Sequence, residues 1–368
     1  MLRLTVPTTG EEELREIAAV LESGFLTQGP KVVEFENAVK AVTGSRHGFA
    51  MSSATTALHL CLVALGIAPG DEVLVSDLTF PASGNVIIQQ GAVPVCVDVL
   101  PDTYAMDAAD LERRITPRSR AVMVVHPFGL SADMDPILEI CRRHGLPLIE
   151  DAACSLGALY RGKPSGTMGT MGCYSFHPRK SVTTGEGGMI VTEDDTLAQR
   201  IQLLRSHGGR RAEVGLEFMD AGFNYRMSDV LAALGVAQMR RLDWLLAGKR
   251  ERATQLSARL REIPGLQLPV EPADCVHSWQ SYVCVLEAGR DQRAVIQRVR
   301  ENGVECTLGT YAMHSQPAFQ SRYGHRPGDL PVSWHLQQHT LTLPLYPQMT
   351  DADLDLVARA VRTALENS

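Results

Sequence analysis

Short β-rich runs alternate with amphipathic helical stretches through the first half of the chain, and this alternation constrains the fold more than any other feature. Buried-type strands separated by helices are typical of βαβ units, whose strands form a mainly parallel sheet. The predicted strands cover residues 72–76, 93–97, 121–125, 146–150, 172–176 and 189–192. The predicted helices between them cover residues 55–65, 81–90, 108–114 and 133–144. In such sheets, ligands bind at the carboxyl ends of the strands.

The pattern changes after Thr192, and a smaller α/β unit begins near Pro264. The elements predicted in this half are helices at 197–205, 290–302 and 351–364, a strand at 281–286, and a long helical pattern, open to a kink, from 227 towards 260. A chain of 368 residues is long enough for two domains. We therefore predict a large domain with an N-terminal segment over residues 1–245 and a small C-terminal domain over residues 246–368.

The composition is that of an ordinary globular protein, with 45% hydrophobic and 21% charged residues. The formal net charge of −7 argues against a nucleic-acid or membrane partner, which would favour a basic patch. The first residues contain no apolar run typical of a secretory signal, so we expect a cytoplasmic protein. The cysteines contain no Cys-x-x-Cys pair, and His335 and His339 lack a third ligand nearby, so we expect no metal.

Lys180 and Ser175 lie five residues apart, between a predicted strand and the glycine-rich run 185–188. A lysine in this setting can form a Schiff base with an aldehyde cofactor, while a hydroxyl and backbone N–H groups hold a phosphate. Ala54 and Thr55 open a predicted helix, where small residues and free N–H groups make an anion site. The plainer interpretations are a solvated loop lysine and an ordinary helix cap.

Two further residues follow predicted strands. Phe80, in the run Leu-Thr-Phe-Pro, could stack on a flat heteroaromatic ring, although a core phenylalanine is the ordinary alternative. Asp151 could pair with a ring nitrogen, because strand alternation points Glu150 to the opposite face; a helix cap or a salt bridge is its alternative. Together, a phosphate cradle, a stacking ring, an acid and a Schiff-base lysine are the parts of a pyridoxal 5′-phosphate site.

In chain order and spacing, these motifs resemble the fold type I pyridoxal phosphate enzymes, and most closely the DegT/StrS-type sugar aminotransferases. The matching runs are residues 58–60, 64–73, 79–82, 150–153, 175–180, 185–188, 204–208 and 224–228. The resemblance implies an α/β fold of the aspartate aminotransferase type. In that fold, a three-layer αβα large domain with a mainly parallel sheet binds the cofactor, and a smaller C-terminal α/β domain follows.

The resemblance also implies a role for each candidate residue. Lys180 holds pyridoxal phosphate as a Schiff base and shuttles the reacting proton, and Asp151 pairs with the pyridine nitrogen. Phe80 stacks on the ring of the cofactor. Ser175 and the backbone of Ala54–Thr55 hold its phosphate.

Asn224 would reach the phosphate of the neighbouring subunit's cofactor, which implies a homodimer with active sites at the subunit interface. Arg226 belongs to the same motif and is a candidate for substrate binding. The chain departs from the family at Cys154, where many relatives have Gln or His, and at the residues before His314, where a His-Tyr pair is common. Cys154 and His314 are therefore further candidates for substrate binding.

The resemblance implies an aminotransferase that works in two half-reactions. An amino acid, in our expectation glutamate, gives its amino group to the cofactor, and the resulting pyridoxamine phosphate aminates a keto sugar. We expect a nucleotide-linked keto-deoxy sugar, used in amino-sugar biosynthesis for a cell-surface polysaccharide or a natural-product glycoside. A carbocyclic ketone is an alternative acceptor, and sugar dehydration is an alternative reaction, although the dehydratase branch has histidine in place of Lys180. A cofactor-bound sensor without turnover is a third interpretation.

Overall fold

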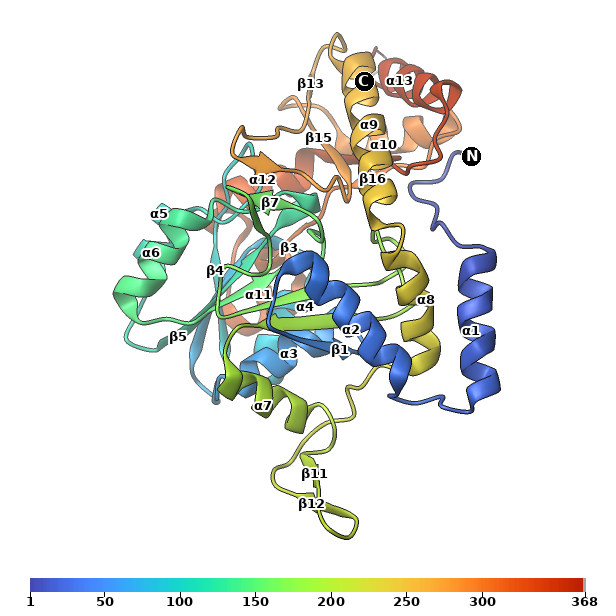
Figure 1. The fold of residues 1–368 in the computed structure, drawn as a ribbon. Coiled ribbons are helices and arrows are strands. Elements are labelled where there is room, and N and C mark those ends of the chain that lie inside the picture. Colours follow the sequence, from blue (N-terminus) through green and yellow to red (C-terminus); the bar gives the residue numbers. More distant parts are fainter. Residues whose placement is uncertain (367–368) are drawn as a thin grey trace.

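The computed structural model describes residues 1–366, and Figure 1 shows a large sheet and its helices below a smaller C-terminal unit. Within this range, seven strands pair in the order β1-β10-β9-β6-β5-β2-β4. The pairs from β4 to β9 are parallel, whereas β10 is antiparallel to both β9 and β1. The strands are β1 (His47–Met51), β2 (Glu72–Ser76), β4 (Val93–Val97), β5 (Ser119–Val125), β6 (Leu148–Asp151), β9 (Met171–Ser175) and β10 (Gly188–Thr192).

Helices cover both faces of this sheet and complete a three-layer arrangement. Successive residues of a strand point to opposite faces, so Val73 and Leu74 belong to different hydrophobic cores. One face packs against α3 (Ala54–Ala64), α4 (Ala82–Gln89) and α7 (Asp195–Leu204). The other face packs against α5 (Ala108–Arg114), α6 (Met134–His144), α2 (Pro30–Thr43) and α8 (Asp229–Met239). The expected fold class, with its mainly parallel sheet, is confirmed.

A second sheet lies in the C-terminal part of the described chain, where four strands pair antiparallel in the order β13-β15-β18-β16. These strands are β13 (Leu266–Gln267), β15 (Tyr282–Leu286), β16 (Thr307–Leu308) and β18 (Thr340–Leu343). The helices of the same unit are α9 (Leu242–Leu260), α10 (Gln292–Glu301) and α13 (Asp351–Glu366). Leu2 and Val6 from the N-terminal segment pack on this core, and Leu2 forms a parallel bridge with Val304.

Helix α9 connects the two units. Its residues Leu242 and Leu245 contact the core formed by α2 and α8, whereas Ala253, Leu256 and Leu260 contact the C-terminal core. The long helical pattern of the sequence is therefore interrupted once, between the end of α8 and the start of α9. The boundary that we expect after residue 245 falls inside α9, and the division into residues 1–245 and 246–368 stays a prediction.

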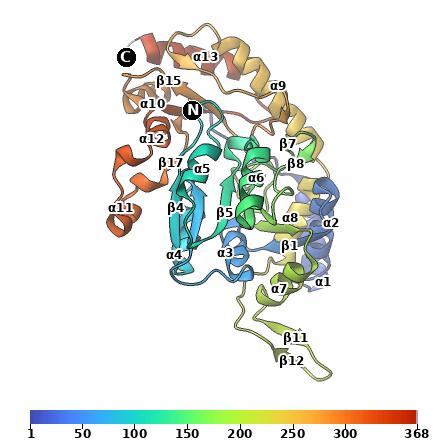
Figure 2. The ribbon, with the colours of Figure 1, turned by 90° about the vertical axis from the view of Figure 1, so that its left-hand side faces the viewer.

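Shorter elements connect the two units and extend from them. They are α1 (Glu11–Ser23), α11 (Pro317–Tyr323), α12 (Pro331–His339), β3 (Leu78–Thr79), β7 (Leu159–Tyr160), β8 (Lys163–Pro164), β11 (Gly209–Arg211), β12 (Leu216–Phe218), β14 (Cys275–Val276) and β17 (Tyr311–Ala312). Figures 1 and 2 both show the β11–β12 hairpin projecting from the end of the molecule opposite α13. Across residues 1–366, no helix is both long enough and apolar enough to cross a bilayer.

Candidate active site

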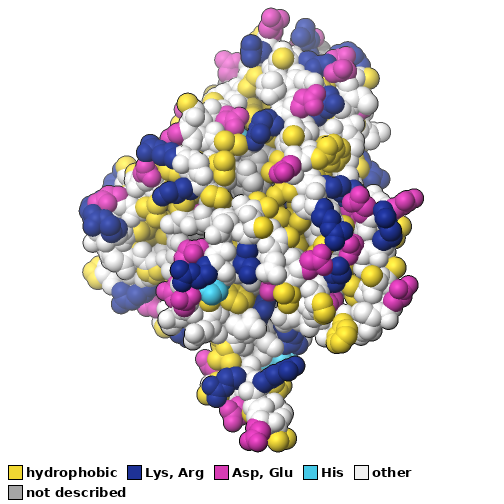
Figure 3. Space-filling view, viewed as in Figure 1, with side chains coloured by type: hydrophobic (Ala, Val, Ile, Leu, Met, Phe, Trp, Pro, Cys, Tyr) yellow, Lys and Arg dark blue, Asp and Glu magenta, His cyan; other side chains and the backbone are white. Residues whose placement is uncertain are grey.

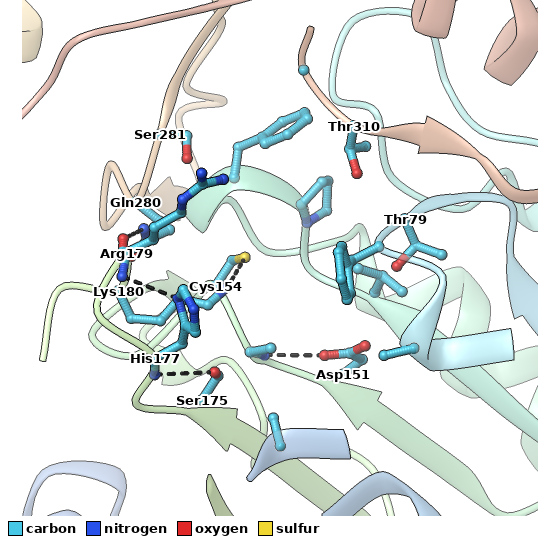
Figure 4. A pocket seen from close by; sticks show the side chains of 18 of the residues that line it. Thr79, Asp151, Cys154, Ser175, His177, Arg179, Lys180, Gln280, Ser281 and Thr310 are labelled. Carbon is cyan, nitrogen blue, oxygen red and sulfur yellow. Dashed lines mark hydrogen bonds between the residues drawn. The ribbon is translucent and has the colours of Figure 1, made fainter. Parts of the chain in front are cut away.

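A cavity of about 660 Å³ lies beyond the carboxyl ends of β6 and β9. Figure 4 shows its two walls: one carries Asp151 and Ser175 from the large sheet and Lys180 from the turn after β9, and the other includes Ser281 and Thr310 from the C-terminal unit. The volume lies within the range of about 300–1,000 Å³ that is usual for small-molecule sites. The position agrees with the expectation that ligands bind at the carboxyl ends of parallel strands.

The N-terminus of α3 opens into this cavity. The first four N–H groups of a helix have no partner within the helix, and the Ser53 hydroxyl accepts one of them, from Thr56, at 3.1 Å. Ala54 and Thr55, the first helical residues, line the cavity. Gly188 at the start of β10 lies against this turn, because a Cβ there would be 2.5 Å from the Ala54 nitrogen. The turn is therefore held from behind while its N–H groups face the cavity, as an anion site requires.

Asp151 and Glu150 point to opposite faces of the sheet, as strand alternation predicts. Glu150 accepts hydrogen bonds from the backbone around Gly166 and contacts the His126 ring at 2.8 Å, away from the cavity. Asp151 lines the cavity and accepts hydrogen bonds from the Ser83 hydroxyl at 2.7 Å and the Ala153 N–H at 3.2 Å. Burial raises the pKa of Asp151, and these bonds offset only part of that effect. A cationic ring nitrogen would compensate this buried carboxylate.

Lys180 follows β9 in a turn, in which its N–H donates to the His177 carbonyl at 2.8 Å. Its side chain lines the cavity, and its Nζ donates a hydrogen bond to the Cys154 Sγ at 2.9 Å. Two separately predicted candidate residues, Lys180 and Cys154, are thus in direct contact. Among the described residues, the Lys180 amine makes no ion pair. Because it lies at the cavity wall, it is available for condensation with an aldehyde.

The other predicted cofactor contacts also line the cavity. Phe80 is 68% exposed although it is a large apolar residue, and its ring forms part of the wall. Ser175 lies at the end of β9, where its Oγ accepts the His177 N–H at 3.5 Å. Burial lowers the pKa of His177, and its Nδ1 accepts the N–H of Arg179 at 3.2 Å. His177 therefore shapes the turn that carries Lys180.

Three candidate substrate or partner contacts lie elsewhere. His314 does not line the cavity described here: its ring is fully buried, with Nδ1 2.6 Å from an Asp77 carboxylate oxygen and Nε2 3.1 Å from the Pro327 carbonyl. Asn224 is exposed at the base of the projecting hairpin, and Arg226 donates to the Ser206 hydroxyl at 3.0 Å. Both ring nitrogens of His314 thus have partners within the chain, and its role in substrate binding stays a prediction.

Several residues of the cavity have no strong signal in the sequence. Ser83 donates a hydrogen bond to Asp151 and contacts the Thr79 hydroxyl. In the sequence, only its position near the start of a predicted helix could have indicated this role. Arg179 lines the cavity, and its position next to Lys180 could have indicated this. Gln280 and Thr310 come from the C-terminal unit, and no local pattern links them to residues more than one hundred positions earlier.

The fold and this arrangement of lysine, carboxylate and helix N-terminus define a fold type I pyridoxal phosphate enzyme. A family profile described as the DegT/DnrJ/EryC1/StrS aminotransferase family matches residues 7–362. The chain belongs to this family. The expected family and enzyme class are thereby confirmed.

Individual relatives agree with this assignment. The chain is 38% identical to the spore coat polysaccharide biosynthesis protein SpsC of Bacillus subtilis (strain 168), over 100% of this chain and 98% of the relative. The structure of aminotransferase TlmJ from Streptoalloteichus hindustanus is 34% identical and superposes with a TM-score of 0.94, over 100% and 99% of the two chains. Spr1654 of Streptococcus pneumoniae, 26% identical with a TM-score of 0.94 over 99% and 98%, has a PLP form, and a PMP form is also solved.

The described side chains fit pyridoxal phosphate on their own chemistry. The open N-terminus of α3 suits the phosphate, the buried Asp151 suits a protonated ring nitrogen, and the Lys180 amine suits the aldehyde carbon. The ring face has Phe80. The expectation of a pyridoxal phosphate enzyme is confirmed for the family, and the individual contacts are proposed below.

Proposed function

We propose that the protein transfers an amino group from glutamate to a keto sugar carried on a nucleoside diphosphate, in amino-sugar biosynthesis for a cell-surface polysaccharide or a natural-product glycoside. The observation that carries the proposal is the meeting of Lys180, Asp151 and the α3 N-terminus in one cavity. Similarity to SpsC supports a sugar destined for a polysaccharide. The polar wall formed by Thr307 and Thr310 supports an acceptor with several hydroxyl groups.

Each part of the cavity would hold one part of the cofactor. The Ala54 and Thr55 N–H groups and the Ser175 hydroxyl would bind the phosphate, with the helix dipole adding to the attraction. Asp151 would accept a hydrogen bond from the ring nitrogen and keep it protonated. Phe80 would cover the ring. When bound, pyridoxal phosphate supplies an electrophilic carbon and an electron sink for the charge that develops at the donor's Cα.

Lys180 would act as the base and acid of the reaction. Its Nζ would take the Cα proton of the amino acid and later return a proton to the new amine-bearing carbon of the sugar. Lysine suits this work because its pKa responds strongly to its surroundings. Cys154, whose Sγ lies 2.9 Å from this Nζ, would orient the amine.

We further propose that the active enzyme is a homodimer in which Asn224 of one subunit completes the phosphate site of the other. Asn224 and Arg226 lie outside the cavity of their own chain. Large apolar side chains are exposed nearby and on the N-terminal helix, among them Phe218, Val214 and Leu21. Figure 3 shows apolar side chains on the projecting hairpin, and such exposure is typical of a surface that meets a partner.

The transfer is tested in two stages. The loaded enzyme is first mixed with glutamate alone, and we expect 2-oxoglutarate to form in a single turnover together with the absorbance change from pyridoxal to pyridoxamine phosphate. A panel of nucleotide-linked keto sugars and one carbocyclic ketone is then added, with mass spectrometry of the products. Lys180→Ala, which removes the amine, should abolish both stages. A first stage without any glutamate-dependent change would contradict the proposed donor.

The shared site is tested by complementation. Lys180→Ala and Asn224→Ala chains are co-expressed with different tags, and the mixed dimer is purified. Each single variant should be inactive, whereas the mixed dimer should regain about a quarter to a half of the wild-type activity, because one of its two sites is intact. A mixed dimer as inactive as its parents would show that Asn224 does not act across the interface.

A further inference from the structure

Lys249 is a buried cation directly beneath the active site. It lies in the middle of α9, is only 3% exposed, and extends from the C-terminal half of the molecule towards the turn that carries Lys180. Its Nζ donates hydrogen bonds to the Ser181 hydroxyl at 3.1 Å and to the Gln280 carbonyl at 3.5 Å. Within residues 1–366, both of these acceptors are neutral, so no carboxylate balances the charge.

Such a group is costly, because a buried ammonium without a counter-ion loses its hydration and gains no ion pair. Burial and, to a lesser extent, the nearby charge of Lys180 together lower the pKa of Lys249 to about 7, although Cys154 acts in the opposite direction. Lys249 therefore gains and loses its proton near neutral pH. A leucine or methionine would fill the same space without this cost, so packing alone is a poor reason for a lysine here.

The hydrogen bonds of Lys249 continue to both chain neighbours of Lys180. The Ser181 hydroxyl donates to the Gln280 Oε1 at 3.3 Å. The Gln280 side-chain amide in turn donates to the Arg179 carbonyl. Lys249, Ser181 and Gln280 thus fix the backbone on either side of Lys180 while the Lys180 side chain stays free to enter the cavity.

We propose that Lys249 is a positioning residue for the reaction at Lys180: its hydrogen bonds to Ser181 and Gln280 fix the turn at residues 179–181 and so set the point from which the Lys180 amine reaches the cofactor. This inference rests on the proposed use of Lys180, but it requires no particular sugar. It assigns a role to a residue far away in sequence, on the helix that connects the two units.

The test uses cofactor binding, which is independent of the sugar. Lys249→Met, Ser181→Ala and the double variant are prepared with the full chain, and Lys163→Met on the exposed strand β8 serves as the matched control for loss of one lysine. The dissociation constant of pyridoxal phosphate and its visible absorbance are measured between pH 6 and 9. Circular dichroism spectra confirm that each variant is folded, and Lys249→Gln replaces Lys249→Met if the latter does not fold.

We expect Lys249→Met to weaken cofactor binding roughly tenfold and Ser181→Ala to have a comparable effect, with the double variant no weaker than Lys249→Met alone, since both changes break one path. The pH dependence of binding near pH 7 should be smaller in Lys249→Met than in the wild type, while Lys163→Met should match the wild type. A folded Lys249→Met variant with unchanged binding at every pH would overturn the proposal. The proposal would also be overturned if the losses in cofactor affinity of the two single variants multiplied in the double variant, because the two residues would then act independently.

Discussion

Replacing Lys249 by methionine should stabilise the protein at neutral pH and destabilise it at high pH. The pKa of Lys249 is lowered from 10.5 to about 7, because folding buries the ammonium group. The unfolded chain therefore binds more protons than the folded chain between pH 7 and 10.5, and the stability of the wild type rises with pH across this window. Below about pH 7 both states are protonated, and the folded state bears the full cost of the buried charge.

The size of the effect follows from the same shift. A pKa difference of 10.5 minus 7 corresponds to roughly 5 kcal/mol at about 1.4 kcal/mol per unit. Methionine removes this cost but leaves the Ser181 hydroxyl without its donor, which costs about 1–3 kcal/mol. We therefore expect Lys249→Met to be more stable than the wild type by about 2–4 kcal/mol at pH 6. At pH 10 the unfolded lysine is still mostly protonated and about 1 kcal/mol of the cost remains, so the variant should be less stable there by up to about 2 kcal/mol.

Urea denaturation at pH 6, 8 and 10, followed by circular dichroism, measures this difference directly. Lys163→Met is again the control, because that exposed lysine should give almost no difference at any pH. The decisive result is the change of sign between pH 6 and pH 10. A stability difference that stays constant with pH would refute the reasoning, since it would mean that Lys249 has the same pKa in the folded and unfolded states.

Three further predictions concern the site and its support. Asp151→Asn should lower kcat roughly 100-fold or more in steady-state assays with little change in fold, because the ring nitrogen loses its anionic partner. Gly188→Ala should weaken cofactor binding by tenfold or more in an absorbance titration, because the new Cβ would displace the Ala54 N–H, whereas Gly10→Ala, in open space, should not. Burial alone would lower the pKa of His314, but the hydrogen bond and the charge of Asp77 raise it above its usual value. The contact with Asp77 therefore stabilises the fold fully below about pH 6.5, and this stabilisation is lost as the pH rises through the raised pKa. In urea titrations His314→Gln should therefore cost about 3–5 kcal/mol at pH 6 and clearly less at pH 9.

Local patterns were sufficient to predict most of the large sheet. The strands β2 and β4 and the helix α5 have the predicted bounds, and the other predicted strands of this sheet differ by one or two residues at one or both ends. Strand alternation correctly separated Asp151 from Glu150. These predictions succeeded because the period of apolar residues and the residues at helix and strand ends act over a few positions.

The rest of the site depends on contacts between distant segments. The wall that contains Gln280 and Thr310 is formed only when the C-terminal unit packs over the sheet, and nothing in their local sequence records that packing. The expectation for His314 rested on a motif, which records neither the burial of its ring nor the contacts of its ring nitrogens with Asp77 and Pro327. Lys249 gave no signal, because a single lysine in a helix is ordinary until its burial is known.

The two walls of the cavity also separate the residues proposed for the chemistry from those proposed for contact with the acceptor. Asp151 ends strand β6 and Lys180 lies in the turn that follows β9, whereas Thr310 belongs to the short segment between β16 and β17. Exchanges in this segment would alter the wall that we propose for the acceptor and would leave Asp151 and Lys180 unchanged. We therefore expect chimeras that take residues 305–312 from a relative to inherit its choice of ketone while they keep the same amino donor. New acceptor specificities could then arise by recombination without any change in the residues proposed to bind the cofactor and transfer protons.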